Sequence, residues 1–251
     1  RNEPSGAWQY PIPPDLSPQT LDWDTWLGTA PKVPFNPMHY QRWRCWQAYG
    51  SGVAGDLFVH LLTGIHYVAG LTAPPERALA SGGLYRWKDG RDVPDVHACV
   101  YDYPKFQVFM RVTLNTETPD VTRFMGTRGL LEIVNNELSF TPQDGLDHGP
   151  SFLSGTWPKK LRDEYVAKWR DENPFKHDAQ TVEGTRYTVP PGYNETREHL
   201  YTFFNAVRSH SPVVEDASFG NNTAIACHMA NHSYYKKTVA TWNAAGKAIK
   251  G

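Results

Sequence analysis

The sequence predicts an α+β fold with a mainly antiparallel β-sheet and an N-terminal arm rich in proline and tryptophan. Three observations predict it. Proline and tryptophan are concentrated in residues 1–47, short segments rich in β-branched and aromatic residues fill residues 83–141, and helical patterns return in residues 159–251. We therefore expect one domain over residues 1–251, organised in that order.

The first part of the chain is expected to form an extended arm over residues 1–47. Its proline density excludes long helices and central strands, and its aromatic side chains can hold the arm against the body. Residues 48–70 then combine a glycine-rich turn with a helix. Apolar residues cover most of that helix from Gly55 to about Ala69, which predicts a largely buried helix that ends at Gly70.

The sheet is expected in residues 83–141, where turn residues separate five short segments. Asn135-Asn136 predicts a hairpin between the last two, because Asn tolerates positive φ. The five expected strands are LYRWK, HACVYDY, FQVFMRVTL, GLLEIV and ELSFT.

Residues 159–251 are expected to hold three closing helices and a last strand. The first helix is charged, exposed and ended by Pro174. The second opens at the N-cap Asn194, and the third begins near Asp216. The last strand is expected at VATW.

Composition excludes several functional classes. The 25 basic and 26 acidic side chains leave a net charge of −1, and without a basic run we expect no nucleic-acid partner. No apolar run approaches the ~20 residues of a membrane helix, so we expect no membrane partner. Cys45, Cys99 and Cys227 lack a C-x-x-C spacing, which argues against a disulfide framework or zinc knuckle and favours small buried side chains.

A literal G-x-G-x-x-G occurs at Gly50, Gly52 and Gly55, with Glu76 about twenty residues later. A dinucleotide-binding turn needs a buried apolar strand before its first glycine and a βαβ unit around it. The entering segment YQRWRCWQAY is polar and bulky, and an antiparallel pattern follows it. We therefore expect a tight turn that gives room to the start of the next helix, and no cofactor-binding residue.

That helix presents polar residues on one stripe. At about 100° per residue, Asp56, His60 and Thr63 share a face, whereas His66 lies about 120° from His60. An acid one turn before a histidine suits proton transfer near neutral pH. An N-cap Asp and a core histidine are the plainer interpretation, and these residues alone leave both open.

The surrounding motifs resemble the C-terminal domain of the Gfo/Idh/MocA oxidoreductases, the glucose-fructose oxidoreductase and inositol dehydrogenase family. The N-terminal motifs resemble a bacterial branch with D-W-x-x-W-L-G-x-A-P, P-F-N-P and R-W-R before a glycine turn. The tail is similar to the closing helices of the family. Its matching segments are FFNAVRSHSPVVEDASFG and CHMANHSYY.

The resemblance implies a large open sheet with helices on one face, whose other face forms homo-oligomers. It implies an NAD or NADP cofactor held mainly by an N-terminal Rossmann domain, which also supplies a Glu-Lys-Pro lysine. The D-x-x-x-H pair of the family matches Asp56 and His60, so His60 would be the catalytic base and Asp56 would orient it or bind substrate. This sequence contains no Rossmann half, and we expect it to be inactive alone.

Further candidates for substrate binding are Thr63, where the family often has Asp, and the R-W-R residues Trp43 and Arg44. Tryptophans of the arm could stack on sugar rings, although anchoring is the plainer role for Trp23 and Trp26. His199 and His228 lie on closing helices that line the cleft in the family. With Asp56 and His60 they have suitable ligand types for a metal, but their spacing does not require one, and we expect no metal.

The expected function is the substrate-binding and catalytic-base half of a NAD(P)-dependent dehydrogenase acting on a sugar, polyol or glycoside hydroxyl. One alternative is an NAD-dependent glycoside hydrolase of the same superfamily. Another is a non-catalytic module for carbohydrate binding or oligomer formation. The compartment stays open, because some relatives begin with an export signal.

Overall fold

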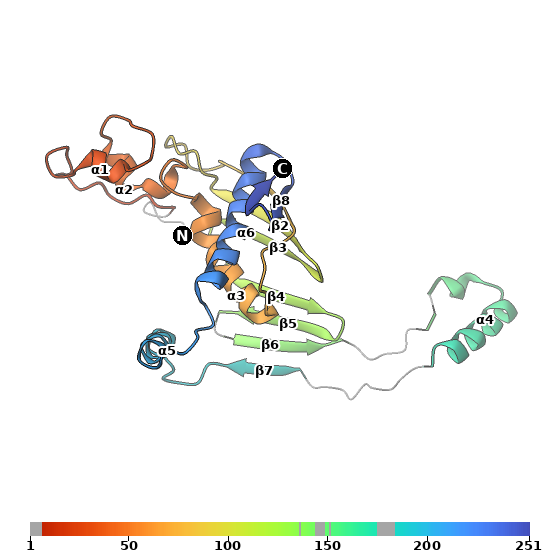
Figure 1. Ribbon diagram of the computed structural model, residues 1–251. Helices are drawn as coiled ribbons and strands as arrows, with labels where there is room; N and C mark the ends of the chain where they lie inside the picture. The colour runs from red at the N-terminus through yellow and green to blue at the C-terminus, as the bar shows by residue number, and fades with distance from the viewer. Residues whose placement is uncertain (1–6, 136, 144–148, 151, 175–183) are drawn as a thin grey trace. The chain divides into compact units, whose positions relative to one another are not determined.

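The computed structural model describes residues 7–135, 137–143, 149–150, 152–174 and 184–251. The chain forms two compact units, one from residues 1–117 and 198–251 and the other from residues 118–197 (Figure 1). The longer helices are α3 (Val59–Ala69), α4 (Lys159–Glu172), α5 (Glu195–Ser209) and α6 (Ala217–Lys236), and the short ones are α1 (Trp23–Leu27), α2 (Pro37–Gln41), η1 (Trp43–Cys45), η2 (Ala54–Phe58) and η3 (Phe152–Thr156).

The strands form two antiparallel sheets. The larger sheet, in the first unit, has the order β3-β2-β1-β8-β9, and the smaller one, in the second unit, has the order β4-β5-β6-β7. The strands are β1 (Arg77–Gly83), β2 (Val96–Tyr103), β3 (Phe106–Thr113), β4 (Val121–Gly126), β5 (Gly129–Val134), β6 (Glu137–Pro142), β7 (Thr185–Thr188), β8 (Ala240–Asn243) and β9 (Ala248–Lys250).

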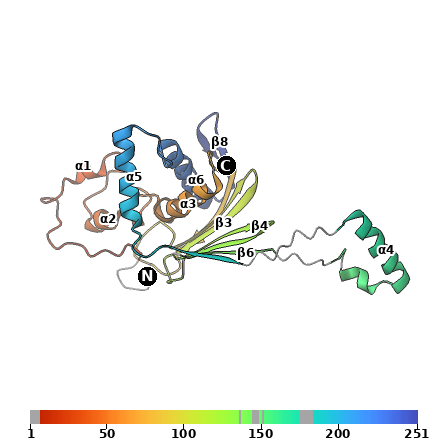
Figure 2. The ribbon, with the colours of Figure 1, turned by 90° about the horizontal axis from the view of Figure 1, so that it is seen from below.

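The core of the first unit lies between the larger sheet and α3 and α6, which pack together on one face of the sheet (Figure 2). Small side chains on β1 let α6 approach closely, and one register row of the covered face joins Ala78, Tyr101 and Val108, all buried. This arrangement confirms the expected α+β fold with helices on one face of a mainly antiparallel sheet.

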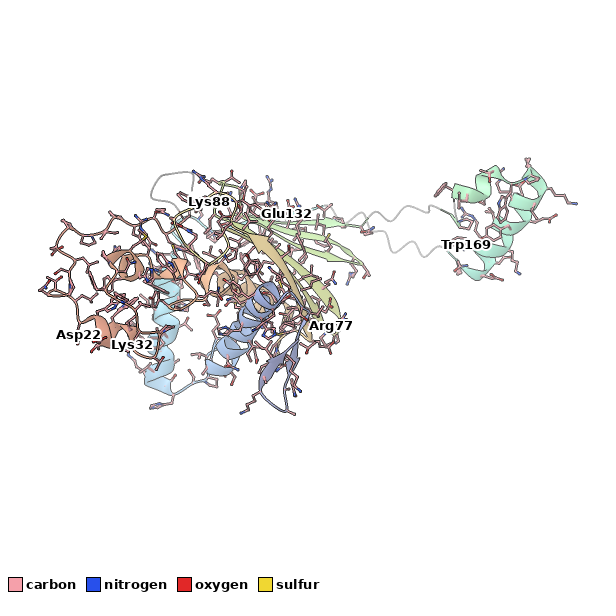
Figure 3. The ribbon with its side chains drawn as sticks, turned by 90° about the horizontal axis from the view of Figure 1, so that it is seen from above. Asp22, Lys32, Arg77, Lys88, Glu132 and Trp169 are labelled. Atoms are coloured by element: carbon pink, nitrogen blue, oxygen red, sulfur yellow. The ribbon has the colours of Figure 1, made fainter. Side chains whose placement is uncertain are left out.

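The opposite face of the larger sheet is not covered by other described elements of the first unit. Leu79 pairs with Val100 and Val100 with Phe109, and the side chains of Leu79 and Phe109 are 55% and 71% exposed. At the end of the same face, Arg77 forms an ion pair with Asp102 at 2.7 Å (Figure 3). An apolar row on an uncovered sheet face is a surface that another protein can cover.

Helix α6 forms side-chain hydrogen bonds with several other segments of the first unit. Asn222 Nδ2 donates to the Thr72 carbonyl, and Asn231 Nδ2 donates to the Ser51 carbonyl in the glycine turn. Buried Ser233 accepts from the Ala80 N–H and donates to a nearby carbonyl. These bonds set the position of the turn against the helix.

The N-terminal arm contains only short helices, as its prolines require. The carboxylate of Asp22 caps α1, and the Asn36 side chain caps α2 with Pro37 at its first position. Trp23 is buried and its indole N–H donates to the Val33 carbonyl at 2.8 Å. Aromatic side chains therefore hold the arm together, and Trp8 and Trp46 join the core.

The smaller sheet of the second unit has a polar and an apolar face. Arg123 pairs with Glu132 and Arg186 with Glu137 on the polar face. The opposite face is apolar and half-buried and carries Phe124, Leu131, Ile133, Leu138 and Phe140.

One predicted strand is wrong. Residues 84–88, LYRWK, form no strand, because the buried carboxylate of Asp95 accepts hydrogen bonds from the backbone N–H groups of Tyr85, Arg86 and Trp87. The strand lies just before, in the small residues of β1. A side chain at Gly82 would meet the Val96 carbonyl at 2.3 Å, so the approach of β2 explains that composition.

Other strand predictions hold in part. The strands HACVYDY, FQVFMRVTL, GLLEIV, ELSFT and VATW are confirmed as β2, β3, β5, β6 and β8, whereas β4, β7 and β9 were not predicted. The expected single sheet is two sheets. Asn135 has a φ of 53° between paired β5 and β6, as the hairpin requires, and Asn136 lies outside the described residues.

The helix predictions are confirmed at their ends. Asn194 accepts from the Arg197 N–H, Asp216 caps α6, and α4 ends before Pro174. Helix α3 ends at Gly70 in the left-handed conformation, as predicted. It is less buried than predicted, because only Leu62 and His66 are buried and its last turn, with Tyr67 and Val68, is exposed. No helix in the described ranges is long and apolar enough to cross a bilayer.

The three cysteines are buried and free, as expected. Burial raises the pKa of their thiols to about 11 for Cys45 and about 12 for Cys99 and Cys227.

Candidate functional site

The three glycines of the motif each lie against a side chain of the protein. A Cβ at Gly50 would come within 3.0 Å of the Trp43 ring, and one at Gly55 would overlap the Ser51 side chain. Gly52 has a φ of 58°, and its Cβ would lie 3.0 Å from Val93. The segment before Gly50 forms the short helix η1, whereas a dinucleotide-binding turn follows a strand. The close contacts at the three glycines fit the expected tight turn.

The turn leads into a π-helical segment, η2, that carries Asp56. A π-turn pairs residues five apart, so the angle of 100° per residue does not hold between Asp56 and the α-helix that follows. Asp56 and His60 make no hydrogen bond or ion pair with each other. Instead both Asp56 carboxylate oxygens accept from Arg44 Nε, at 3.0 and 3.1 Å.

Arg44 reaches Asp56 from the short helix η1. Its guanidinium also lies 4.3 Å from the centre of the Trp43 ring, a cation–π geometry. Only Nε bonds to Asp56, so within the described residues the two terminal nitrogens keep their donors for other groups. With the two side chains 31% and 29% exposed, this fixed donor fork is accessible to a hydroxyl or carboxylate.

His60 is exposed on the first turn of α3 and has no hydrogen-bond partner in the described part of the chain. A free imidazole on a helix surface can accept a proton from a ligand. Thr63, one turn later, donates its hydroxyl back to the Val59 carbonyl at 2.7 Å, which leaves its oxygen able to accept.

His66 has a different role from His60, as its position on the helix predicted. It is fully buried, its Nε2 lies 2.8 Å from the Tyr103 hydroxyl, and its burial lowers its pKa. His97 on β2 is also fully buried, between the rings of Phe58 and Tyr234, and neither of its nitrogens has a described partner. Burial, helped by Lys237, lowers the pKa of His97 to about 4, so both imidazoles are neutral core residues.

The two other candidate histidines are exposed. His228 lies on α6, one turn before Asn231, whose side chain bonds to the glycine turn. His199 lies on α5, and neither histidine forms a hydrogen bond or ion pair with Asp56 or His60 in the described residues. Among the described residues no three potential ligands lie close enough to hold a metal, and the structure does not unite these four.

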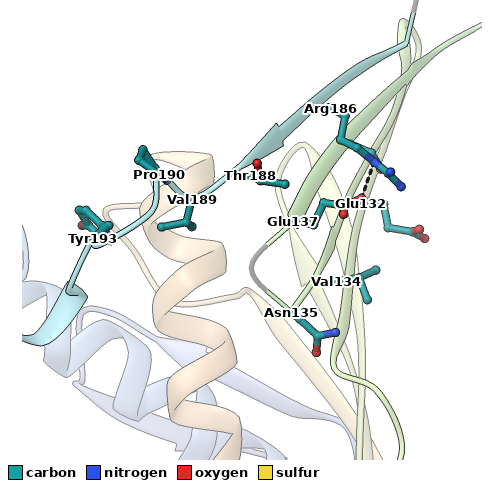
Figure 4. Close-up of a pocket in the computed structure, with 10 residues that line it drawn as sticks. Glu132, Val134, Asn135, Glu137, Arg186, Thr188, Val189, Pro190 and Tyr193 are labelled. Carbon is teal, nitrogen blue, oxygen red and sulfur yellow. Dashed lines mark ion pairs between the residues drawn. The ribbon is translucent and has the colours of Figure 1, made fainter.

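Each unit has a pocket that the sequence did not single out as a cavity. In the first unit, a pocket of about 550 Å³ lies between the arm and the glycine turn and is lined by Trp26, Trp43 and Tyr49 among others. The second unit has a polar pocket of about 710 Å³ beside the Arg186–Glu137 ion pair (Figure 4). No predicted site residue lines the second pocket, whereas Trp43 lines the first.

Comparison with known proteins finds a family match for the N-terminal part of the chain. Residues 7–75 match a family described as the C-terminal alpha/beta domain of an oxidoreductase family, Gfo/Idh/MocA. This range includes Arg44, Asp56, His60 and Thr63. Among curated proteins, none matches the sequence.

Several solved structures are similar to the chain. UDP-N-acetylglucosamine 3-dehydrogenase from Acidithiobacillus ferrooxidans is 15% identical with a TM-score of 0.51, over 81% of this chain and 51% of that one. An NAD-binding protein from Listeria innocua is 14% identical with a TM-score of 0.49, over 84% and 56%. An oxidoreductase from Agrobacterium radiobacter in complex with NAD+, L-tartaric acid and magnesium is 14% identical with a TM-score of 0.48, over 82% and 53%.

At these identities the first likeness shows the shared fold alone, and the chain spans about half the length of the solved structures it matches. The family match over the arm, the glycine turn and α3 confirms the resemblance found in the motifs. Over residues 7–75, this chain matches the C-terminal domain of the Gfo/Idh/MocA oxidoreductase family.

Proposed function

We propose that this chain is the substrate-binding and catalytic-base half of a NAD(P)-dependent oxidoreductase that acts on a sugar, polyol or glycoside hydroxyl. The observation that carries the proposal is the Arg44–Asp56 pair at the start of the helix that carries an exposed His60, all within the family match. The nicotinamide that accepts the hydride would be held by a Rossmann half, because the glycine turn of this chain follows a short helix instead of a strand.

In this proposal each residue has a separate task. The terminal nitrogens of Arg44 donate to substrate oxygens, and Asp56 holds the guanidinium in place through both its oxygens. His60 accepts the proton of the reacting hydroxyl, for which it is exposed and has no hydrogen-bond partner among the described residues. Thr63 and His228 would border the substrate, and His199 has no structural support beyond its exposure.

The open face of the larger sheet supports an accompanying proposal that the chain forms a homo-oligomer. Leu79 and Phe109 make an exposed apolar row there, and burying such a row is favourable. Sedimentation of the wild type and of a Phe109→Ser variant tests it. A shift of the variant to the monomer supports the assignment, and the same mass for both contradicts it.

The catalytic proposal is tested by joining the chain to its nucleotide-binding half and assaying a panel of sugars, polyols and glycosides. Wild type, His60→Ala and the matched control His232→Ala, a histidine on α6 outside the site, are compared. NAD(P)H formation that only His60→Ala abolishes supports the dehydrogenase. Equal rates for all three contradict the role of His60.

The product identifies which alternative is correct if the dehydrogenase proposal fails. Release of free sugar without net NADH would instead indicate an NAD-dependent glycoside hydrolase. Sugar binding or oligomers that persist in His60→Ala, with no turnover by any version, would indicate a non-catalytic module.

A further inference from the structure

We propose that the aromatic pocket between the arm and the glycine turn binds the ring of a neutral sugar. The pocket holds about 550 Å³, within the range of about 300–1,000 Å³ typical of small-molecule sites. Its lining comes from two segments that the fold brings together, Trp26 to Pro31 in the arm and Trp43 to Tyr49 before the turn. The inference deepens the proposed function and rests on it for the choice of sugar as the class of ligand.

The pocket has the flat apolar surfaces that a sugar ring requires. Trp26 and Trp43 both line it, and the C–H faces of a pyranose can pack on such rings. The Trp26 ring stacks on the Trp23 ring with 4.7 Å between the ring centres. It also lies tilted against the ring of Tyr49, which lines the pocket as well, with 4.9 Å between the ring centres. A rigid aromatic wall loses little entropy when a ligand binds.

Polar groups at the same wall can bond to hydroxyls. Neither the Trp26 nor the Trp43 indole N–H has a hydrogen-bond partner among the residues the structure describes, and the Thr29 hydroxyl has none there either. The Tyr49 hydroxyl lies 3.0 Å from His39 Nδ1 and keeps further hydrogen-bonding capacity. A purely apolar ligand would leave these donors unpaired, at a cost in affinity.

Charge narrows the class of ligand. Every residue that lines the pocket is uncharged, so a phosphate or carboxylate would lose hydration without gaining a partner. The neighbouring site has the opposite character, because Trp43 also contacts the charged guanidinium of Arg44 at 4.3 Å. A neutral sugar ring in the pocket would therefore lie next to the Arg44–Asp56 pair.

The test measures binding to this chain alone. Neutral methyl glycosides and disaccharides of glucose, galactose and N-acetylglucosamine are titrated by saturation-transfer NMR, with glucose 6-phosphate and a proline-rich peptide as competing classes. Trp26→Leu removes one stacking face, and Thr29→Val removes only an exposed hydroxyl, so it preserves folding. Trp157→Leu, a partly exposed tryptophan of the second unit, and His232→Ala, a histidine on α6 outside the site, are the matched controls.

We expect Trp26→Leu to raise the dissociation constant for the sugar about tenfold and Thr29→Val to raise it about threefold. Both control variants should bind the sugar as the wild type does. The proposal is overturned if no neutral sugar binds, if neither pocket variant weakens binding, or if only the phosphate or the peptide binds there. Failure of the proposed function would look different: sugar binding would depend on Trp26, but turnover of the joined protein would not depend on His60.

Discussion

Replacement of Gly52 by alanine is the sharpest test of the glycine turn. Gly52 has a φ of 58°, and the added Cβ would lie 3.0 Å from both Cβ and Cγ1 of buried Val93. The left-handed conformation costs alanine about 1–2 kcal/mol, and crowding in a packed core costs about 1–3 kcal/mol more. We expect Gly52→Ala to lower the free energy of unfolding by about 2–5 kcal/mol.

Gly70 provides a matched control for this substitution. It lies in the left-handed conformation with a φ of 61°, but nothing lies within 4 Å of an added Cβ, so Gly70→Ala has only the conformational cost of about 1–2 kcal/mol. Urea unfolding of both variants, with constant m-values, measures the difference. A double-mutant cycle with Val93→Ala isolates the contact. Equal losses for Gly52→Ala and Gly70→Ala would refute the explanation of the turn by close packing.

The remaining predictions concern the core of the first unit. The pKa of His97 is about 4 in the folded protein and 6.5 in the unfolded chain. The neutral imidazole therefore makes its full contribution to the free energy of unfolding above pH 6.5. This contribution, about 3 kcal/mol, is lost as the pH falls to 4. Urea unfolding between pH 7 and pH 4 should show this loss of stability, and His97→Phe should reduce the dependence of stability on pH. The same pH dependence in wild type and His97→Phe would contradict the assignment. Ser233→Ala should cost about 1–3 kcal/mol in the same measurement, because it leaves the buried Ala80 N–H without its acceptor, whereas an exposed Ser211→Ala should change little. The thiols of Cys45, Cys99 and Cys227 should resist Ellman's reagent in the native protein and react on unfolding, because burial raises their pKa. Rapid labelling of the native protein would contradict the burial of these thiols.

Local patterns predicted the helix ends and most strands. The N-caps Asn194 and Asp216 and the C-cap at Gly70 act within one turn of the chain, so the sequence itself contains both partners of each interaction. The strand expected at residues 84–88 is wrong because the acceptor that turns this segment away, Asp95, lies on a later segment. Hydrogen bonds between segments distant in the sequence produce no periodic pattern of residues from which they could be predicted.

The candidate site could be predicted in its residues but not in its contacts. Trp43, Arg44, Asp56 and His60 were named from motifs, yet the pairing of Asp56 with Arg44 depends on η1 folding back onto the π-helical turn. A π-turn has no sequence pattern in the 3.6-residue period, so the expected stripe from Asp56 to His60 assumed a regular helix. The aromatic pocket could not be predicted from the sequence, because its lining residues come from two segments that only the fold brings together.

The pH dependence of kcat tests the central claim, that this chain supplies the base, most directly. It is measured on the chain joined to its nucleotide-binding half, for wild type, His60→Gln and the control His232→Gln. A catalytic imidazole predicts a rate that rises with pH as it loses its proton, and a loss of about 10²–10⁴-fold with no such rise in His60→Gln. An unchanged rate and the same pH profile in His60→Gln would contradict the account.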